Sequence, residues 1–164
     1  LTDVADSLDT GLILSEQAVK DSIVTDVQLL PDGLDITIGS IFSLEKSLVG
    51  LVVASSGSQE LPDTATVPAE YDLATIGKEI STQGYALGPI SPSISTESVV
   101  VPVVDAEDYC HGGVAVLLPT DISDRQREQI IEAAIRLRTR IENRLDSGWQ
   151  STRSFATEKH SWIS

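Results

Sequence analysis

The sequence predicts an α+β fold in which helices pack on an antiparallel sheet. Short β-branched segments occur in two groups, within residues 11–38 and 98–119, and turn-forming residues separate the members of each group. Helical periodicity occupies the middle and the last third. The 164 residues suit one domain with one core, which 41% hydrophobic and 4% aromatic residues would fill mostly with Val, Ile, Leu and Ala.

The first group of strands is expected within the first 40 residues. Residues 1–8 have apolar positions at helical spacing and would end a helix. Residues 11–15 indicate a short strand, and residues 22–30 alternate as a strand does. A Pro-Asp-Gly turn at 31–33 leads into a second alternating segment at 34–38. We expect these strands to be antiparallel neighbours.

Two helices are predicted next. Ser43 would cap a helix that runs to about residue 54, and residues 55–69 are rich in Pro, Ser and Gly, which is typical of an exposed connection. Asp72 would cap the second helix, and Gly84 would end it in a left-handed conformation.

The second group of strands follows. Residues 86–97 are polar and predict a loop or a weak strand. Residues 98–105 are β-branched and predict a strand buried on both faces, with a bulge or an edge at Pro102. After a turn at 106–111, residues 112–119 would form the return strand.

A long helix is expected from Ser123 to about Leu145. One continuous apolar stripe runs along it, formed by Ile130, Ala134, Leu137, Ile141 and Leu145. Arginines lie off this stripe and indicate a solvated face, although a nucleic-acid strip is an alternative. Residues 147–164 lose periodicity and are expected to form a tail.

The charge of the chain is strongly negative and unevenly distributed. The net charge is −14, and residues 1–124 carry 20 acids against 3 bases. Such a surface repels phosphate backbones, so this part of the protein is not expected to contact DNA. Many acids with few lysines are typical of proteins from concentrated salt, where screening is strong and acids keep the surface hydrated. The alternative is an ordinary acidic cytoplasmic domain.

The sequence offers little chemistry for catalysis. Cys110 and His111 adjoin each other, but no second Cys/His pair exists to complete a zinc site. GxSxG, GxGxxG and Walker motifs are missing, so we expect no enzyme, no cofactor and no metal. No apolar run is long enough to cross a membrane, and no signal peptide is visible. The absence of methionine suggests a piece of a longer protein, and a single cysteine, Cys110, favours a reducing, cytoplasmic setting.

A series of motifs resembles the effector domain of IclR-type transcription regulators. These motifs are a helix ending in Gln-Gly-Tyr (83–85), a strand with Val-Pro-Val-Val-Asp (101–105), a return strand ending in Pro119 and a long helix from Ser123. The resemblance covers about residues 1–146 and implies a GAF-like fold with a sheet of about six strands. It also implies a small-molecule effector, a homo-dimer or tetramer, and a DNA-binding helix-turn-helix domain that is missing here. The basic face of the last helix could then be a subunit interface.

The resemblance also places an effector pocket, whose expected positions are Leu48, Val49, Gly50, Gly88, Thr96, Ser98, Ala115 and Leu117. The lysine that the family has after the helix glycine is Leu51 here, the acidic position is Gly88, and two hydroxyl positions are Ala115 and Leu117. With several polar groups lost, we expect a larger, more apolar effector or none. Ala115 and Leu117 could equally be core residues, whereas Thr96 and Ser98 are the stronger candidates for ligand contact.

The function that follows is ligand sensing and oligomerisation for attached DNA-binding domains. The alternatives are an oligomerisation scaffold with a degenerate pocket and, from another class, a small-molecule enzyme. Stabilisation by a ligand would favour sensing, whereas an enzyme requires a reactive polar cluster that the sequence does not show.

Overall fold

The computed structural model describes residues 11–17, 21–28, 36, 39–56, 61 and 66–146. Six strands form one antiparallel sheet in the order β3-β2-β1-β6-β5-β4. The elements in chain order are β1 (Leu12–Gln17), β2 (Asp21–Gln28), β3 (Ile41–Ser43), α2 (Leu48–Ser55), α3 (Leu73–Gln83), β4 (Ala86–Ser91), β5 (Ile94–Val104), β6 (Cys110–Leu117) and α4 (Asp124–Asp146). The predicted α+β class, with helices packed on an antiparallel sheet, is confirmed.

The strands come from two parts of the chain that meet in the middle of the sheet. β4, β5 and β6 follow one another as an antiparallel meander, and β1 pairs with β6. Across this junction Ile13 lies opposite Ala115, which in turn lies opposite Val100. These three side chains are buried on one face of the sheet.

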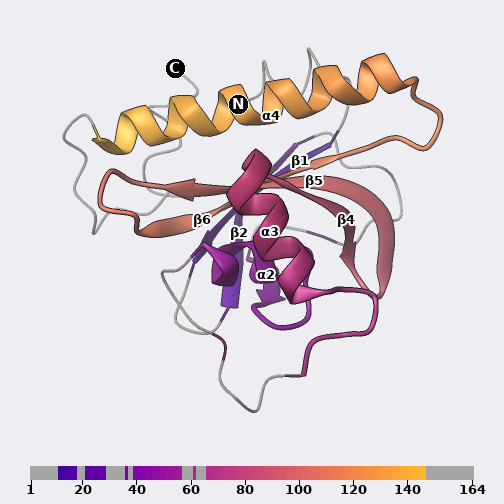
Figure 1. The fold of residues 1–164 in the computed structure, drawn as a ribbon, viewed down its shortest axis with the longest axis horizontal. Coiled ribbons are helices and arrows are strands. Elements are labelled where there is room, and N and C mark those ends of the chain that lie inside the picture. Colours follow the sequence, from indigo (N-terminus) through magenta and orange to yellow (C-terminus); the bar gives the residue numbers. More distant parts are fainter. Residues whose placement is uncertain are drawn as a thin grey trace.

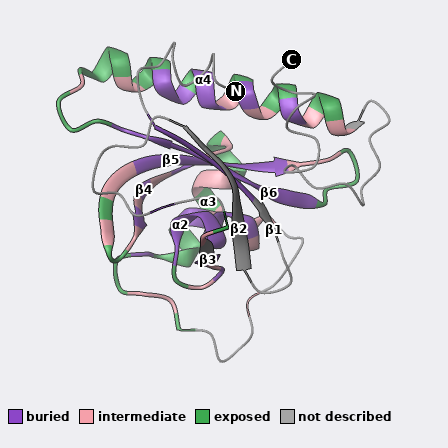
Figure 2. Ribbon diagram, turned by 180° about the vertical axis from the view of Figure 1, so that it is seen from behind, coloured by how far each residue is buried: buried purple, intermediate pink, exposed green. Residues whose placement is uncertain are grey.

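Helices cover both faces of the sheet (Figure 1). The long helix α4 lies across one face, where its apolar stripe packs on alternate residues of β1, β5 and β6. The shorter helices α2 and α3 lie on the other face and complete a second core. In Figure 2 the buried residues of α4 form a band toward the sheet, and its exposed residues face outward. The two cores therefore share the sheet and differ in the helices that close them.

Several local predictions are confirmed by the ends of the helices. The Asp72 carboxylate accepts a hydrogen bond from the N–H of Ala74 at the start of α3, and Gly84 ends that helix with φ +85°. At the start of α4, the N–H of Gln126 donates to Ser123 Oγ, while Gln126 Oε1 accepts from the N–H of Ser123. This reciprocal pair satisfies two backbone donors, as a capping box does.

The start of α2 was predicted wrongly. The N-cap is Ser47, whose Oγ accepts from the N–H of Gly50 at 3.0 Å, and not Ser43. Ser43 ends β3, and its carbonyl accepts from the hydroxyl of Ser47 at 2.8 Å. A turn of three residues, 44–46, separates the two serines, so the helix starts one turn later than expected.

The region around Pro89 was also underestimated, because residues 86–91 and 94–97 belong to full strands and not to a loop. β4 is at the edge of the sheet, where glycine and proline are tolerated. Pro102 fits its predicted edge environment, since β4 pairs with β5 only as far as Val100. The predicted segments at 1–8 and 147–164 lie outside the described residues, as does 34–38 except for Ile36.

Candidate ligand pocket

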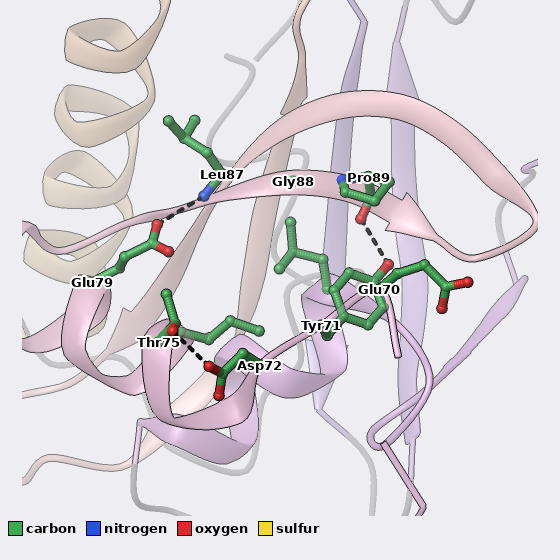
Figure 3. Close-up of a pocket in the computed structure, with 10 residues that line it drawn as sticks. Glu70, Tyr71, Asp72, Thr75, Glu79, Leu87, Gly88 and Pro89 are labelled. Carbon is green, nitrogen blue, oxygen red and sulfur yellow. Dashed lines mark hydrogen bonds between the residues drawn. The ribbon is translucent and has the colours of Figure 1, made fainter. Parts of the chain in front are cut away.

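A cavity of about 210 Å³ lies between the edge strand β4, the first turns of α3 and the start of α2 (Figure 3). It is lined by Leu48, Glu70, Tyr71, Asp72, Thr75, Ile76, Glu79, Leu87, Gly88 and Pro89. Leu48, Tyr71 and Ile76 are buried and form its apolar base, whereas Glu70, Asp72 and Thr75 are exposed. The site is therefore a depression with an apolar base and a polar rim.

The outer edge of β4 forms one wall, and the other residues of the cavity satisfy its backbone groups. Glu79 Oε2 accepts a hydrogen bond of 3.3 Å from the N–H of Leu87, and the hydroxyl of Tyr71 donates to the carbonyl of Pro89 at 2.7 Å. Pro89 has no N–H to satisfy. An edge strand needs such cover, because free backbone groups invite pairing with another chain. The side chains of α3 and Tyr71 hold β4 in place along this wall (Figure 3).

Tyr71 is held in its neutral form by its surroundings. Burial of the phenol raises the pKa of Tyr71 to about 12, and the negative charge of Glu70 acts in the same direction, while a backbone hydrogen bond at Leu48 opposes them. The phenol therefore remains a hydrogen-bond donor at all ordinary pH values.

The polar rim carries negative charge, and its hydroxyl group already donates a hydrogen bond within the protein. Both oxygens of Asp72 accept hydrogen bonds within α3, one of them from the hydroxyl of Thr75. The hydrogen bond from Thr75 lowers the pKa of Asp72, so this carboxylate stays charged. Glu70 and Glu79 add two further carboxylates, and no Lys or Arg is found among the described residues that line the cavity. Ionised carboxylates only accept hydrogen bonds, so the cavity presents mainly hydrogen-bond acceptors to a ligand.

Two of the eight expected pocket residues line this cavity. Leu48 forms part of its base and Gly88 part of the β4 wall. A Cβ built on Gly88 would lie 3.5 Å from Cδ2 of Leu48, which is an ordinary contact distance. The glycine therefore leaves open a space that a longer side chain would occupy.

Ser98 and Thr96 lie on β5, behind the wall that Gly88 belongs to. Ser98 is fully buried, and its hydroxyl donates to the carbonyl of Gly88 at 3.1 Å. Thr96 is half-buried. Neither residue lines the cavity, and Ser98 is linked to it only through its hydrogen bond to the Gly88 carbonyl.

The four remaining expected residues lie in or beside the core under α2. Val49, Ala115 and Leu117 belong to the buried cluster on that face of the sheet. Gly50 is buried where α2 passes very close to the backbone of Ser43 and Leu44, so a Cβ there would collide with the Ser43 carbonyl. The structure thus gathers most of the expected residues on one face but brings only Leu48 and Gly88 to the cavity.

Sequence reasoning missed the residues that give the cavity its polarity, above all Tyr71 and Glu79. A signal for Tyr71 existed, because it stands directly before the predicted N-cap Asp72, a place where an apolar residue often packs on its helix. No comparable signal exists for Glu79, since its role depends on β4 lying beside α3.

The Cys110–His111 pair sits in the β5–β6 hairpin, where His111 contacts Asp105. His111 Nε2 lies 2.9 Å from Asp105 Oδ2, and the other Asp105 oxygen accepts from the N–H groups of Glu107 and Tyr109. Burial would raise the pKa of Asp105, but these hydrogen bonds outweigh it and hold the pKa below its usual value. Among the described residues, no group of three or more His, Cys, Asp and Glu is placed to hold a metal ion.

Comparisons with known proteins identify the fold. An IclR-type regulator from Silicibacter superposes with a TM-score of 0.72 at 16% identity, covering 92% of this chain and 66% of that one. The Thermotoga maritima IclR gives a TM-score of 0.68 at 16% identity, over 88% of this chain and 65% of that one. The C-terminal domain of a transcriptional regulator from Vibrio cholerae gives 0.66 at 12% identity, with 85% and 90% covered. The fold is that of the C-terminal domain of IclR-type transcription regulators.

These likenesses at low identity establish the fold alone. The chain spans 63% of an IclR-type regulator from Alicyclobacillus acidocaldarius and 66% of the Silicibacter protein. Neither protein-family profiles nor curated proteins give a match. Among the described helices, none is both long and apolar enough to cross a bilayer.

Proposed function

We propose that this chain is the ligand-sensing domain of a cytoplasmic transcription regulator, and that the cavity beside β4 is where its effector enters. The observation that carries the proposal is a cavity lined by Leu48 and Gly88 in a fold shared with IclR-type regulators. In the proposed mechanism the ligand favours one arrangement of the domain, and DNA-binding domains attached in the whole protein read that change.

The chemistry of the cavity narrows the class of effector. Among its described lining residues, the space of about 210 Å³ has three carboxylates and no base, so entry of an anion would bring like charges together without compensation. A ligand with a cationic or hydroxyl head and a short apolar body would instead donate to Glu70 and Glu79 and contact Leu48 and Ile76. This proposal refines the expectation of an apolar effector, because the apolar contacts remain but the rim requires donors.

A matched series of four-carbon probes tests both points. The thermal unfolding midpoint of the chain would be followed with n-butylammonium, 1-butanol and butyrate in 1 M salt. At that ionic strength the Debye length is about 3 Å, so only direct contacts distinguish the probes. We expect the midpoint to rise with concentration for the amine and the alcohol and to stay constant for butyrate.

Variants assign any effect to the cavity. Glu70→Gln and Glu79→Gln remove a charge from the rim, whereas Glu132→Gln removes one from the exposed surface of α4, where Glu132 pairs with Arg136. Stabilisation by the amine should fall in the first two variants and persist in the third. A flat response to every probe would favour the alternative of an oligomerisation scaffold, and stabilisation by butyrate alone would overturn the ligand class.

High salt belongs to the proposed setting of this protein. The net charge of −14 is expected to repel parts of the chain from one another at low ionic strength. We propose adaptation to concentrated salt, as the composition suggests, and assembly into dimers or tetramers. Sedimentation and unfolding measured between 0.1 and 3 M salt test both, since stability that does not rise with salt would contradict the first.

A further inference from the structure

Arg138 on α4 reaches around the edge of the sheet to the end of α3. Its Nη1 donates to the carbonyl of Gly84 at 3.3 Å, and its Nε lies 3.8 Å from Oε1 of Glu142. The Nε atom is buried and has no hydrogen-bond partner among the described residues. The guanidinium is therefore incompletely satisfied, with one long hydrogen bond and one long ion pair.

Glu142 extends this contact to the sheet. Its Oε2 accepts a hydrogen bond of 2.8 Å from the N–H of Val104, the last residue of β5. One helix thus holds both the end of α3 and the end of β5 through two neighbouring side chains, although α3 and α4 pack on opposite faces of the sheet. Gly84 permits the approach, since a Cβ there would lie 2.8 Å from Nη1 of Arg138.

The same end of α3 is connected to the cavity. Glu79, five residues before Gly84, lines the cavity and holds the N–H of Leu87. The side chain of Leu87 packs against the core cluster to which α4 contributes. The segment from α3 to β4 therefore contacts α4 at two places, through the Leu87 side chain and through the Arg138 guanidinium.

We propose that Arg138 couples the cavity to α4, and that it does so because its partly buried guanidinium has two alternative acceptors, the Gly84 carbonyl and the Glu142 carboxylate. A small shift of Gly84 relative to α4 changes the balance between the Gly84 carbonyl and Glu142, and it changes the hold of Glu142 on Val104. Such a side chain is a two-state element that both sites can bias. Its use in signalling rests on the proposed function, whereas the coupling itself is a property of the chain without ligand.

Amide hydrogen exchange of the full 164-residue chain, followed by NMR, tests the coupling without any ligand. In Arg138→Ala, exchange at Val104 and at Leu87 should accelerate by about tenfold, the order expected when a hydrogen bond to a charged group is lost. Leu87 is the informative amide, because Arg138 does not bond to it. In Glu79→Gln, the Nε–H resonance of Arg138 should shift.

Arg136→Ala is the matched control, since Arg136 lies on the same helix with its side chain 70% exposed. It should leave exchange at Leu87 and Val104 unchanged. An unchanged Leu87 amide in folded Arg138→Ala, or equal acceleration in Arg136→Ala, would overturn the proposal.

Arg138→Lys keeps the charge without the fork and serves if Arg138→Ala does not fold. Arg138→Lys would also be combined with Glu79→Gln in a double-mutant cycle. The change in the unfolding equilibrium constant of the double variant should differ by about twofold or more from the product of the two single changes. Independent effects of the two substitutions would contradict the coupling. Failure of every probe to bind at the cavity would remove the proposed function and leave this result standing.

Discussion

The two faces of the sheet are closed in different ways. On one face a single helix of 23 residues, α4, lays Ile130, Ala134, Leu137 and Ile141 on the strands, and all four are buried. On the other face two short helices share the task, and α2 comes so close that Gly50 packs against backbone. The first face is closed by side chains of one helix, whereas the second combines a side-chain core with one close backbone approach at Gly50.

This difference indicates which face of the sheet has space for a ligand. The described cavity lies on the face closed by short helices, at the junction of α2, α3 and β4. Close-packed layers lose stability when atoms are removed, and backbone contacts lose it when atoms are added. Substitutions of opposite kind should therefore separate the two faces.

The largest effect is expected on the α4 face. Leu137→Ala leaves a cavity at a position 4% exposed and should lower the free energy of unfolding by about 3.5 kcal/mol. Urea unfolding measures the loss. Leu73→Ala on α3, where the side chain is 37% exposed, should cost well under about 1 kcal/mol. Equal costs at the two sites would show that the α4 face is loosely packed.

Gly50→Ala should break the other face by adding one methyl group. The new Cβ would collide with the backbone of Ser43 and Leu44, so α2 would have to move, at a cost of about 2–3 kcal/mol. The control is Gly77→Ala in α3, which has nothing within 4 Å and should stabilise the helix by up to about 1 kcal/mol. The same urea titrations give both values, and a neutral Gly50→Ala would refute the close approach.

Gly84→Ala should cost about 1–2 kcal/mol, because φ is +85° and a Cβ is disfavoured in that region. The added carbon also displaces the Arg138 guanidinium. Asparagine tolerates this backbone region better, so Gly84→Asn should recover part of the loss in thermal unfolding. If Asn is no better than Ala, contact with Arg138 and not backbone strain dominates.

Tyr71→Phe should cost about 1 kcal/mol at neutral pH through loss of the hydrogen bond to Pro89. The folded pKa of Tyr71 is raised to about 12 from 10.0, so stability is fully present below pH 10 and falls as the pH rises through 12. Unfolding measured at several alkaline pH values, with absorbance titration of the phenols, should show this fall in the native chain. It should be smaller in Tyr71→Phe, and identical pH profiles would contradict the assignment.

Gly88→Ala is expected to have the smallest effect on stability, within about 0.5 kcal/mol, since the Cβ would make an ordinary contact with Leu48. Its effect should fall on binding, because the methyl group occupies part of the cavity. Titration with n-butylammonium should therefore be weakened while the unfolding midpoint without ligand stays the same. A drop in stability with unchanged binding would place the ligand elsewhere.

The parts of the fold that carry their own local signals were predictable from the sequence. Asp72 and Gly84 delimit α3 as expected, and the β-branched run before Val104 is a buried strand. Two serines four residues apart could each cap α2, and only the turn between them decides for Ser47. The sequence did not distinguish a strand from a loop at β4, because its glycine and proline are compatible with an edge strand as well as with a loop.

The cavity was less predictable than the fold. Leu48 and Gly88 were reached through the family resemblance, but six other expected positions do not line the cavity. The polar groups of the rim come from residues 70–79, whose meeting with β4 depends on tertiary packing. Periodicity along one segment contains no information about which distant segment that segment will contact.

The pairing of β1 with β6 has a consequence for how the chain is made. Ser15 donates its hydroxyl to the carbonyl of Gly113, a contact that spans 98 positions of sequence. During synthesis the first strand must therefore wait for nearly the whole domain to leave the ribosome before its central neighbour exists. Contacts of such long range slow folding, and the waiting strand has an open edge meanwhile. Nascent β1 would then be a segment that benefits from protection by chaperones.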